Sequence, residues 1–148
     1  MAEQPALTAL GFDFGLRRIG VAVGTTVTGS ARDLTVIRNT EAGPDWAGIA
    51  SLISEWRPDL AVVGVPYNKD GSRSDLTVRA ERFARQLAVR SGFRVETVDE
   101  RLSSREAEAC LKAERQDGRR KRSVDAGAVD MRAASVILER WLAAEHSP

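Results

Sequence analysis

Three acidic residues stand where the surrounding sequence predicts buried or sheet-edge positions, and they are the first candidates for chemistry. Asp13 lies within the apolar segment ALGFDFG, and Glu100 follows the strand-like segment FRVETV. At 3.6 residues per turn, Asp130 shares the apolar face of a helix with Ala134 and Trp141. A buried carboxylate is costly unless hydrogen bonds or positive charge compensate it. Because three converging carboxylates repel one another, we expect divalent cations to neutralise them.

Oxygen ligands of this kind select Mg²⁺ or Mn²⁺. Two such ions about 4 Å apart can activate a water molecule and stabilise the leaving oxygen during phosphodiester hydrolysis. The remaining residues agree with carboxylate chemistry, because His146 is the only histidine and Cys110 the only cysteine. A histidine-based triad, a two-histidine zinc site and an intramolecular disulfide are therefore excluded.

Each acid also has a structural interpretation. Asp13 is suited to capping the turn after its strand, and Asp130 to favouring the dipole of its helix from the first turn. Asp99 and Glu100 together can form a surface ion pair with Arg101, which contributes little. Successive strand residues point to opposite faces, so only one of Asp99 and Glu100 is expected at a common site.

Basic residues are concentrated locally, because the net charge of the whole chain is only +1. The segment 115–122 holds five cations against Asp117 and precedes Asp130. Such a run is either a solvated loop or a set of phosphate contacts that read no base sequence. The turn-rich loop 66–74 offers a second phosphate contact. The residues expected to bind nucleic acid are Arg17, Arg18, Lys69, Arg73, Arg101, Arg119, Arg120, Lys121 and Arg122.

The elements that must position these residues follow an α/β pattern. Strands are expected over 8–15, 19–24, 34–37, 60–65 and 93–98, and helices over 44–56, 75–90, from Ser103 or Ser104 to about 114, and from Asp125 or Ala128 to about 144. The short early turns favour antiparallel pairing of the first three strands. The continuous apolar run LAVVGV predicts a strand buried on both faces. Together these elements predict a mixed five-stranded sheet flanked by helices.

Length and composition are those of one domain spanning residues 1–148, with 43% hydrophobic and 29% charged residues. No apolar run approaches the roughly 18 residues of a membrane span, and residues 1–5 lack a signal-peptide pattern. We therefore expect a cytoplasmic protein without membrane contact.

Four segments, in this order, resemble the YqgF/RuvX family of RNase H-like proteins, described as Holliday-junction resolvases or as pre-16S rRNA processing nucleases. None is specific alone, but together they cover nearly the whole chain. They are DFGLRRIGVAVG at 13–24, GVPYNKDGSRS at 64–74, VDERLSSREA at 98–107 and VDMRAASVILERWL at 129–142.

The resemblance implies an RNase H-like sheet, a cytoplasmic setting and a role in maturing the 5′ end of 16S rRNA. It also implies Asp13, Glu100 and Asp130 as the acidic site. The wider resolvase group carries an acid inside the strand that here reads LAVVGV, so this chain must use Glu100 instead. Asp125 is a second candidate for the helical acid, although it faces away from the stripe of Asp130.

Four functions are compatible with these features. The leading one is a metal-dependent nuclease acting on RNA. A nuclease for branched or single-stranded DNA is the second, and a symmetric junction then requires a homodimer rather than a monomer. A nucleotide-binding domain of the actin and sugar-kinase type is the third, but it needs a second domain. The fourth is a non-catalytic RNA-binding or ribosome-assembly factor, for which retained acids have no use.

Overall fold

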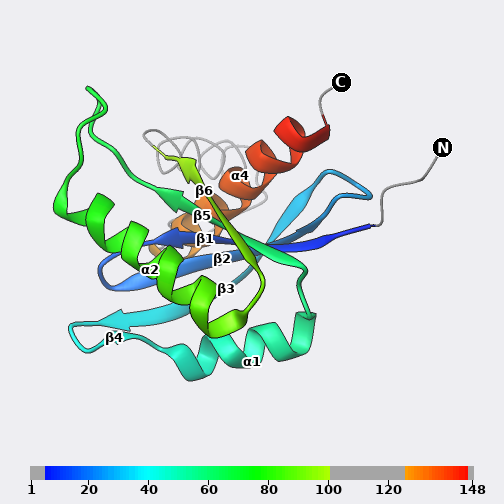
Figure 1. Ribbon diagram of the computed structural model, residues 1–148, viewed down its shortest axis with the longest axis horizontal. Helices are drawn as coiled ribbons and strands as arrows, with labels where there is room; N and C mark the ends of the chain where they lie inside the picture. Colours follow the sequence, from blue (N-terminus) through cyan, green and yellow to red (C-terminus); the bar gives the residue numbers. More distant parts are fainter. Residues whose placement is uncertain (1–5, 101–125, 147–148) are drawn as a thin grey trace, which may run out of the picture.

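A computed structural model describes residues 6–100 and 126–146 of the chain. The strands are β1 Thr8–Phe14, β2 Arg18–Thr25, β3 Ala31–Thr40, β4 Gly43–Pro44, β5 Leu60–Val65 and β6 Arg94–Asp99, and the helices are α1 Trp46–Trp56, α2 Asp75–Ser91 and α4 Ala126–His146. One face of the sheet carries α1 and α2, and the opposite face carries α4 (Figure 1). Within the described residues, no helix is both long and apolar enough to span a membrane.

The sheet has the strand order β4-β3-β2-β1-β5-β6. The pairs β1–β2 and β2–β3 are antiparallel, whereas β5 runs parallel to β1 and β6 parallel to β5. The mixed sheet with an antiparallel beginning is therefore confirmed. The predicted count of five strands was wrong by one, because the two-residue strand β4 pairs with the end of β3. A pair this short leaves no periodic pattern in the sequence.

Two elements also differ clearly from their predicted ranges. The third strand spans 31–40 rather than 34–37, since its partly exposed ends lack the apolar residues that mark its centre. Helix α1 begins at Trp46 rather than at Pro44, because Asp45 is its N-cap and accepts a hydrogen bond from the amide of Gly48. The helix predicted from Ser103 or Ser104 to about 114 lies outside the described residues.

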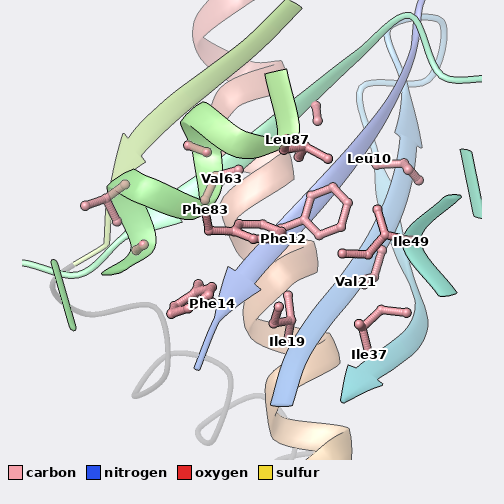
Figure 2. Packing of buried hydrophobic residues seen from close by; sticks show 14 of the residues in the cluster. Leu10, Phe12, Phe14, Ile19, Val21, Ile37, Ile49, Val63, Phe83 and Leu87 are labelled. Carbon is pink, nitrogen blue, oxygen red and sulfur yellow. The ribbon is translucent and has the colours of Figure 1, made fainter. Parts of the chain in front are cut away.

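Alternating residues of the strands build a core on each face of the sheet. Toward α1 and α2, Phe12 and Phe14 pack against Phe83 (Figure 2), with ring centroids 5.6 and 5.3 Å from it. The ring of Trp46 stacks on Phe83 at 5.5 Å. Toward α4, Leu138 packs among small strand residues. All six residues of β5 are buried, which confirms the strand predicted to be covered on both faces.

Candidate acidic site

Asp13 stands near the carboxyl end of β1, on the sheet face that α4 covers. Strand residues two apart point the same way, and a side chain at Gly11 would contact Leu138 of α4. The residue as a whole is partly exposed, but its carboxyl group is largely removed from water. Removal from water raises its pKa from 3.8 to about 7, and the negative charge of Asp130 adds to this rise. A nearby positive charge would therefore favour the ionised form of Asp13.

Two glycines flank Asp13 in the sheet, and the other two acids approach over them. The register pairs Asp13 with Gly20 of β2 and with Gly64 of β5. A Cβ atom at Gly20 would lie 1.9 Å from the backbone oxygen of Asp130, and one at Gly64 would lie 2.3 Å from Cγ of Glu100. Neither contact is sterically allowed, so both positions require glycine. The missing side chains let Asp130 and Glu100 approach from the two sides of Asp13.

Glu100 directly follows β6 and is buried, with 6% of its surface exposed. Its amide donates to the carbonyl of Val65 at 3.0 Å, which extends the pairing of β5 and β6 by one residue. Asp99 pairs in register with Val65, whose side chain belongs to the core under α1 and α2. Asp99 accordingly faces that side and lines a small cavity with Tyr67. The structure thus separates the two neighbouring acids and places Glu100 on the face of Asp13.

Asp130 lies in the second turn of α4, and its side chain is 24% exposed. Arg18, the first residue of β2, binds it through Nε, at 2.8 Å from Oδ2 of the carboxylate. The interpretation of Asp130 as a first-turn acid that favours the helix dipole is wrong, because no acidic residue lies in the first turn of α4. Sequence spacing did not predict the ion pair with Arg18, because 112 positions separate the two residues.

The turn between β1 and β2 is held by Asn39, not by Asp13. The side-chain amide of Asn39 donates to the carbonyl of Gly15 at 2.7 Å, and its backbone amide donates to the carbonyl of Arg17 at 3.0 Å. None of the hydrogen bonds among the described residues uses the Asp13 carboxyl group. The turn-capping interpretation of Asp13 is therefore not supported.

A second ion pair fixes the start of α4 on the sheet. Nε of Arg132 lies 3.2 Å from Oδ1 of Asp33 in β3, and Oγ of Ser135 donates to the same oxygen at 2.7 Å. Asp33 thus binds two residues that follow Asp130 along the helix. Sequence reasoning did not select Asp33, since an acid in a half-exposed strand is unremarkable without its partners.

The donor set suits a hard divalent cation, because it consists of carboxylate oxygens and because the charge of Asp130 adds to the cost of ionising Asp13. As the side chains stand, however, no group of three or more His, Cys, Asp or Glu residues in the described ranges is gathered to hold a metal ion. The guanidinium of Arg18 occupies Oδ2 of Asp130 instead.

The other residues expected to bind nucleic acid are only partly described. Arg17 and Lys69 are exposed, and Arg73 is exposed and forms an ion pair with Glu81. Four of the remaining expectations are the basic residues of the segment 115–122. The predicted residues that lie outside the described ranges are Arg101, Arg119, Arg120, Lys121 and Arg122, together with the alternative acid Asp125.

The mixed sheet, with its antiparallel opening and helices on both faces, defines a fold of the RNase H-like, resolvase type. Solved structures agree. Thermus thermophilus RuvC, in complex with a Holliday junction substrate, has a TM-score of 0.53 at 17% identity and is covered over 95% of its length by 94% of this chain. The Fowlpox virus resolvase, in complex with Holliday junction DNA, has a TM-score of 0.56 at 7% identity, with 95% of this chain and 100% of that chain covered.

The chain belongs to the RuvX family, described as Holliday junction resolvase, which it matches over residues 7–144. A relative from Azotobacter vinelandii named "Putative pre-16S rRNA nuclease" is 51% identical over 90% of this chain and 92% of its own length. A relative of the same name from Pseudomonas paraeruginosa is 49% identical over 98% of this chain and 97% of its own length. The recognised resemblance is confirmed, and a nuclease function follows from it.

Proposed function

We propose that the protein is a metal-dependent nuclease that hydrolyses RNA phosphodiester bonds and matures the 5′ end of pre-16S rRNA. The observation that carries this proposal is the arrangement around Asp13: glycines on both neighbouring strands admit Asp130 from one side and Glu100 from the other. Asp130 and Glu100 thus pack beside the two strand neighbours of Asp13, which supports the proposal that the three acids act together once a cation is bound.

In the proposed mechanism, Asp13 and Asp130 are the principal ligands of Mg²⁺ or Mn²⁺, and Glu100 completes the acidic site. Bound divalent cations would supply an activated water molecule and stabilise the leaving oxygen. Asp13 gains most from such a charge, since its ionised form is the one disfavoured in the metal-free site. Glu100 is buried, and its side chain packs over Gly64 of β5 beside Ile137 of α4.

Exposed cations around this edge are proposed to hold the phosphate backbone. Arg17 lies in the β1–β2 turn and Lys69 in the loop after β5, so both flank the carboxyl ends of the two central strands. Contacts of this kind position a strand without reading its bases. The basic residues of 115–122 are proposed to extend this surface, and the site to work in the cytoplasm, where ribosomal precursors are processed.

RNA is the preferred substrate class because the close relatives are named for pre-16S rRNA. The family description and the resolvase structures with bound junctions favour a second candidate, cleavage of branched DNA. Symmetric resolution of a junction needs two sites related by a two-fold axis. Sedimentation measures the oligomeric state of the protein on each substrate, and a cleavage assay shows which substrate it cuts. A monomer that cuts RNA is the proposed nuclease, whereas a dimer that cuts the junction is a resolvase.

The decisive test is cleavage of a pre-16S rRNA 5′ fragment and of a four-way junction in Mg²⁺ or Mn²⁺. Asp13→Asn, Glu100→Gln and Asp130→Asn should each reduce cleavage at least about a hundredfold, since each weakens metal-assisted charge stabilisation. Asp99→Asn is the matched control, because that carboxylate faces the other core, and it should retain cleavage. Equal activity of Asp13→Asn and the wild type would refute the site. Tight RNA binding by the wild type without any cleavage would favour the non-catalytic alternative.

A further inference from the structure

Arg18 forms a partly exposed ion pair with Asp130, one of the three proposed acids. The hairpin pairs Phe14, the last residue of β1, with Ile19. Arg18 precedes Ile19 in the chain and therefore lies just past the carboxyl end of β1. Its side chain is 42% exposed, that of Asp130 is 24% exposed, and the ion pair between them joins β2 to α4. The guanidinium therefore stands between solvent and a carboxylate that raises the pKa of Asp13.

The ion pair is close enough to the acids to influence any other cation. Charges a few ångströms apart at a partly shielded surface still interact after solvent screening, although less strongly than buried charges do. A guanidinium bound to Oδ2 of Asp130 both takes up one ligand oxygen and repels a divalent ion at the other. It also holds Asp130 in place, and the acids in the described ranges are not gathered into a metal-binding group.

We infer that Arg18 is the internal counter-ion of Asp130 and competes with the divalent cation for that carboxylate. In the metal-free protein it balances the charge of Asp130 and holds the start of α4 against β2. Release of Asp130 from Arg18 then frees both carboxylate oxygens to turn toward Asp13. This inference rests on the proposed function, because it assigns the competing cation to the same acids.

Competition and an ordinary structural role of Arg18 predict opposite changes in metal affinity when Arg18 is lost. If Arg18 merely positioned Asp130 as a ligand, its loss would weaken metal binding. If it competes, its loss must strengthen metal binding, an effect that local unfolding cannot produce. Arg17 provides a matched control, because it carries the same charge one position earlier and is exposed.

The test measures Mn²⁺ binding to the protein without nucleic acid, at pH 8 and low ionic strength. The electron paramagnetic resonance signal of the free ion reports how much Mn²⁺ remains unbound. Arg18→Gln should bind Mn²⁺ about fivefold more tightly than the wild type, as expected for loss of a partly exposed ion pair and of its repulsion. Arg18→Lys should stay close to the wild type, and Arg17→Gln should change the affinity by less than twofold. The gain of Arg18→Gln should shrink in 0.5 M salt.

Equal or weaker Mn²⁺ binding by Arg18→Gln, with a circular dichroism spectrum and Tm close to the wild type, would overturn the inference and leave the proposed function standing. The acids themselves are tested by Asp130→Asn, which should weaken Mn²⁺ binding at least tenfold. If Asp130→Asn binds Mn²⁺ as the wild type does, or if no protein binds Mn²⁺, the metal site and the competition fail together.

Discussion

The Asp13 carboxyl group couples protonation, stability and the proposed metal site at a single residue. Its pKa of about 7 in the folded chain exceeds the ordinary value of 3.8, with burial as the larger cause and Asp130 as the smaller. The folded protein therefore holds this proton more tightly than the unfolded chain does. A raised carboxyl pKa contributes stability that is fully present below about pH 4 and is lost as the pH rises through 7.

We predict that Asp13→Asn removes this loss of stability. Relative to the variant, the wild type should lose up to about 4 kcal/mol of unfolding free energy between pH 4 and pH 8, because one pKa unit corresponds to about 1.4 kcal/mol. Urea denaturation of both proteins in EDTA measures the difference, and comparison of the pair cancels the other titrating groups. A difference that is constant with pH would show that Asp13 ionises normally.

The same ionisation makes metal affinity depend on pH. A cation binds the charged carboxylate, so Mn²⁺ affinity of the wild type should rise about tenfold per pH unit below pH 7 and level off above it. Isothermal titration between pH 5.5 and 8.5 follows this change. A flat profile in the wild type would place the cation away from Asp13.

Gly20 and Gly64 have no side chains, and this leaves the space in which Asp130 and Glu100 pack beside the neighbours of Asp13. Alanine at Gly20 would meet the helix backbone at Asp130, and alanine at Gly64 would meet Glu100 and Ile137. We expect Gly20→Ala and Gly64→Ala each to lower the unfolding free energy by about 1–3 kcal/mol through overpacking. Gly20→Ala should be the more severe because a backbone cannot turn aside. Unchanged Tm values for both variants would contradict the close approach.

At the scale of elements, the packing of α4 on the sheet determines the position of Asp130. The helix contacts β2 through Gly20 and the Arg18 ion pair, and it contacts β3 through the pairing of Arg132 with Asp33. Two ion pairs within one turn of the helix thus fix its beginning. The rest of the helix is held by apolar packing against β1, β2 and β5.

We predict that Asp33→Ala loosens the start of α4 without unfolding the chain. It leaves the partly buried Arg132 and the Ser135 hydroxyl without this acceptor, which should cost about 1–3 kcal/mol. Faster amide exchange in 128–135 and reduced cleavage should accompany the loss. Asp45→Ala, which removes the N-cap of α1 at a cost of about 1 kcal/mol, is the matched control and should leave both α4 exchange and cleavage unchanged.

At the scale of the whole molecule, the proposed acidic site and the phenylalanine cluster (Phe12, Phe14 and Phe83) lie on opposite faces of the sheet. The core under α1 and α2 contains the phenylalanine cluster (Figure 2), whereas the α4 face has a second apolar core and carries the acids near the carboxyl end of β1. The net charge of +1 supplies no general attraction for nucleic acid. Affinity must then come from the few cations placed around that edge.

We predict that RNA affinity depends on salt through these local contacts. Arg17→Gln should reduce the slope of log affinity against log salt by about 0.7, the value for one phosphate contact on a single strand. Arg94→Gln is the control, because Arg94 begins β6 at the opposite edge of the sheet and pairs with Glu96. Equal slopes for the wild type and Arg17→Gln would place the RNA elsewhere.

The sequence by itself determined most of the elements, the doubly buried strand LAVVGV and the selection of Asp13, Glu100 and Asp130 as acids in unusual positions. These inferences depend on local periodicity and on the cost of burying charge, both of which can be evaluated within a short segment. The family resemblance also follows from segments that can be read directly along the chain.

Only the tertiary structure decided which neighbours those acids have. The ion pair of Arg18 with Asp130 joins residues 112 positions apart, and the bonds of Asp33 to Arg132 and Ser135 join residues about as distant. The role of Gly20 and Gly64 depends on the register of three strands and on how closely α4 packs. Such contacts follow from packing across the whole sheet, and spacing within one segment carries no information about them.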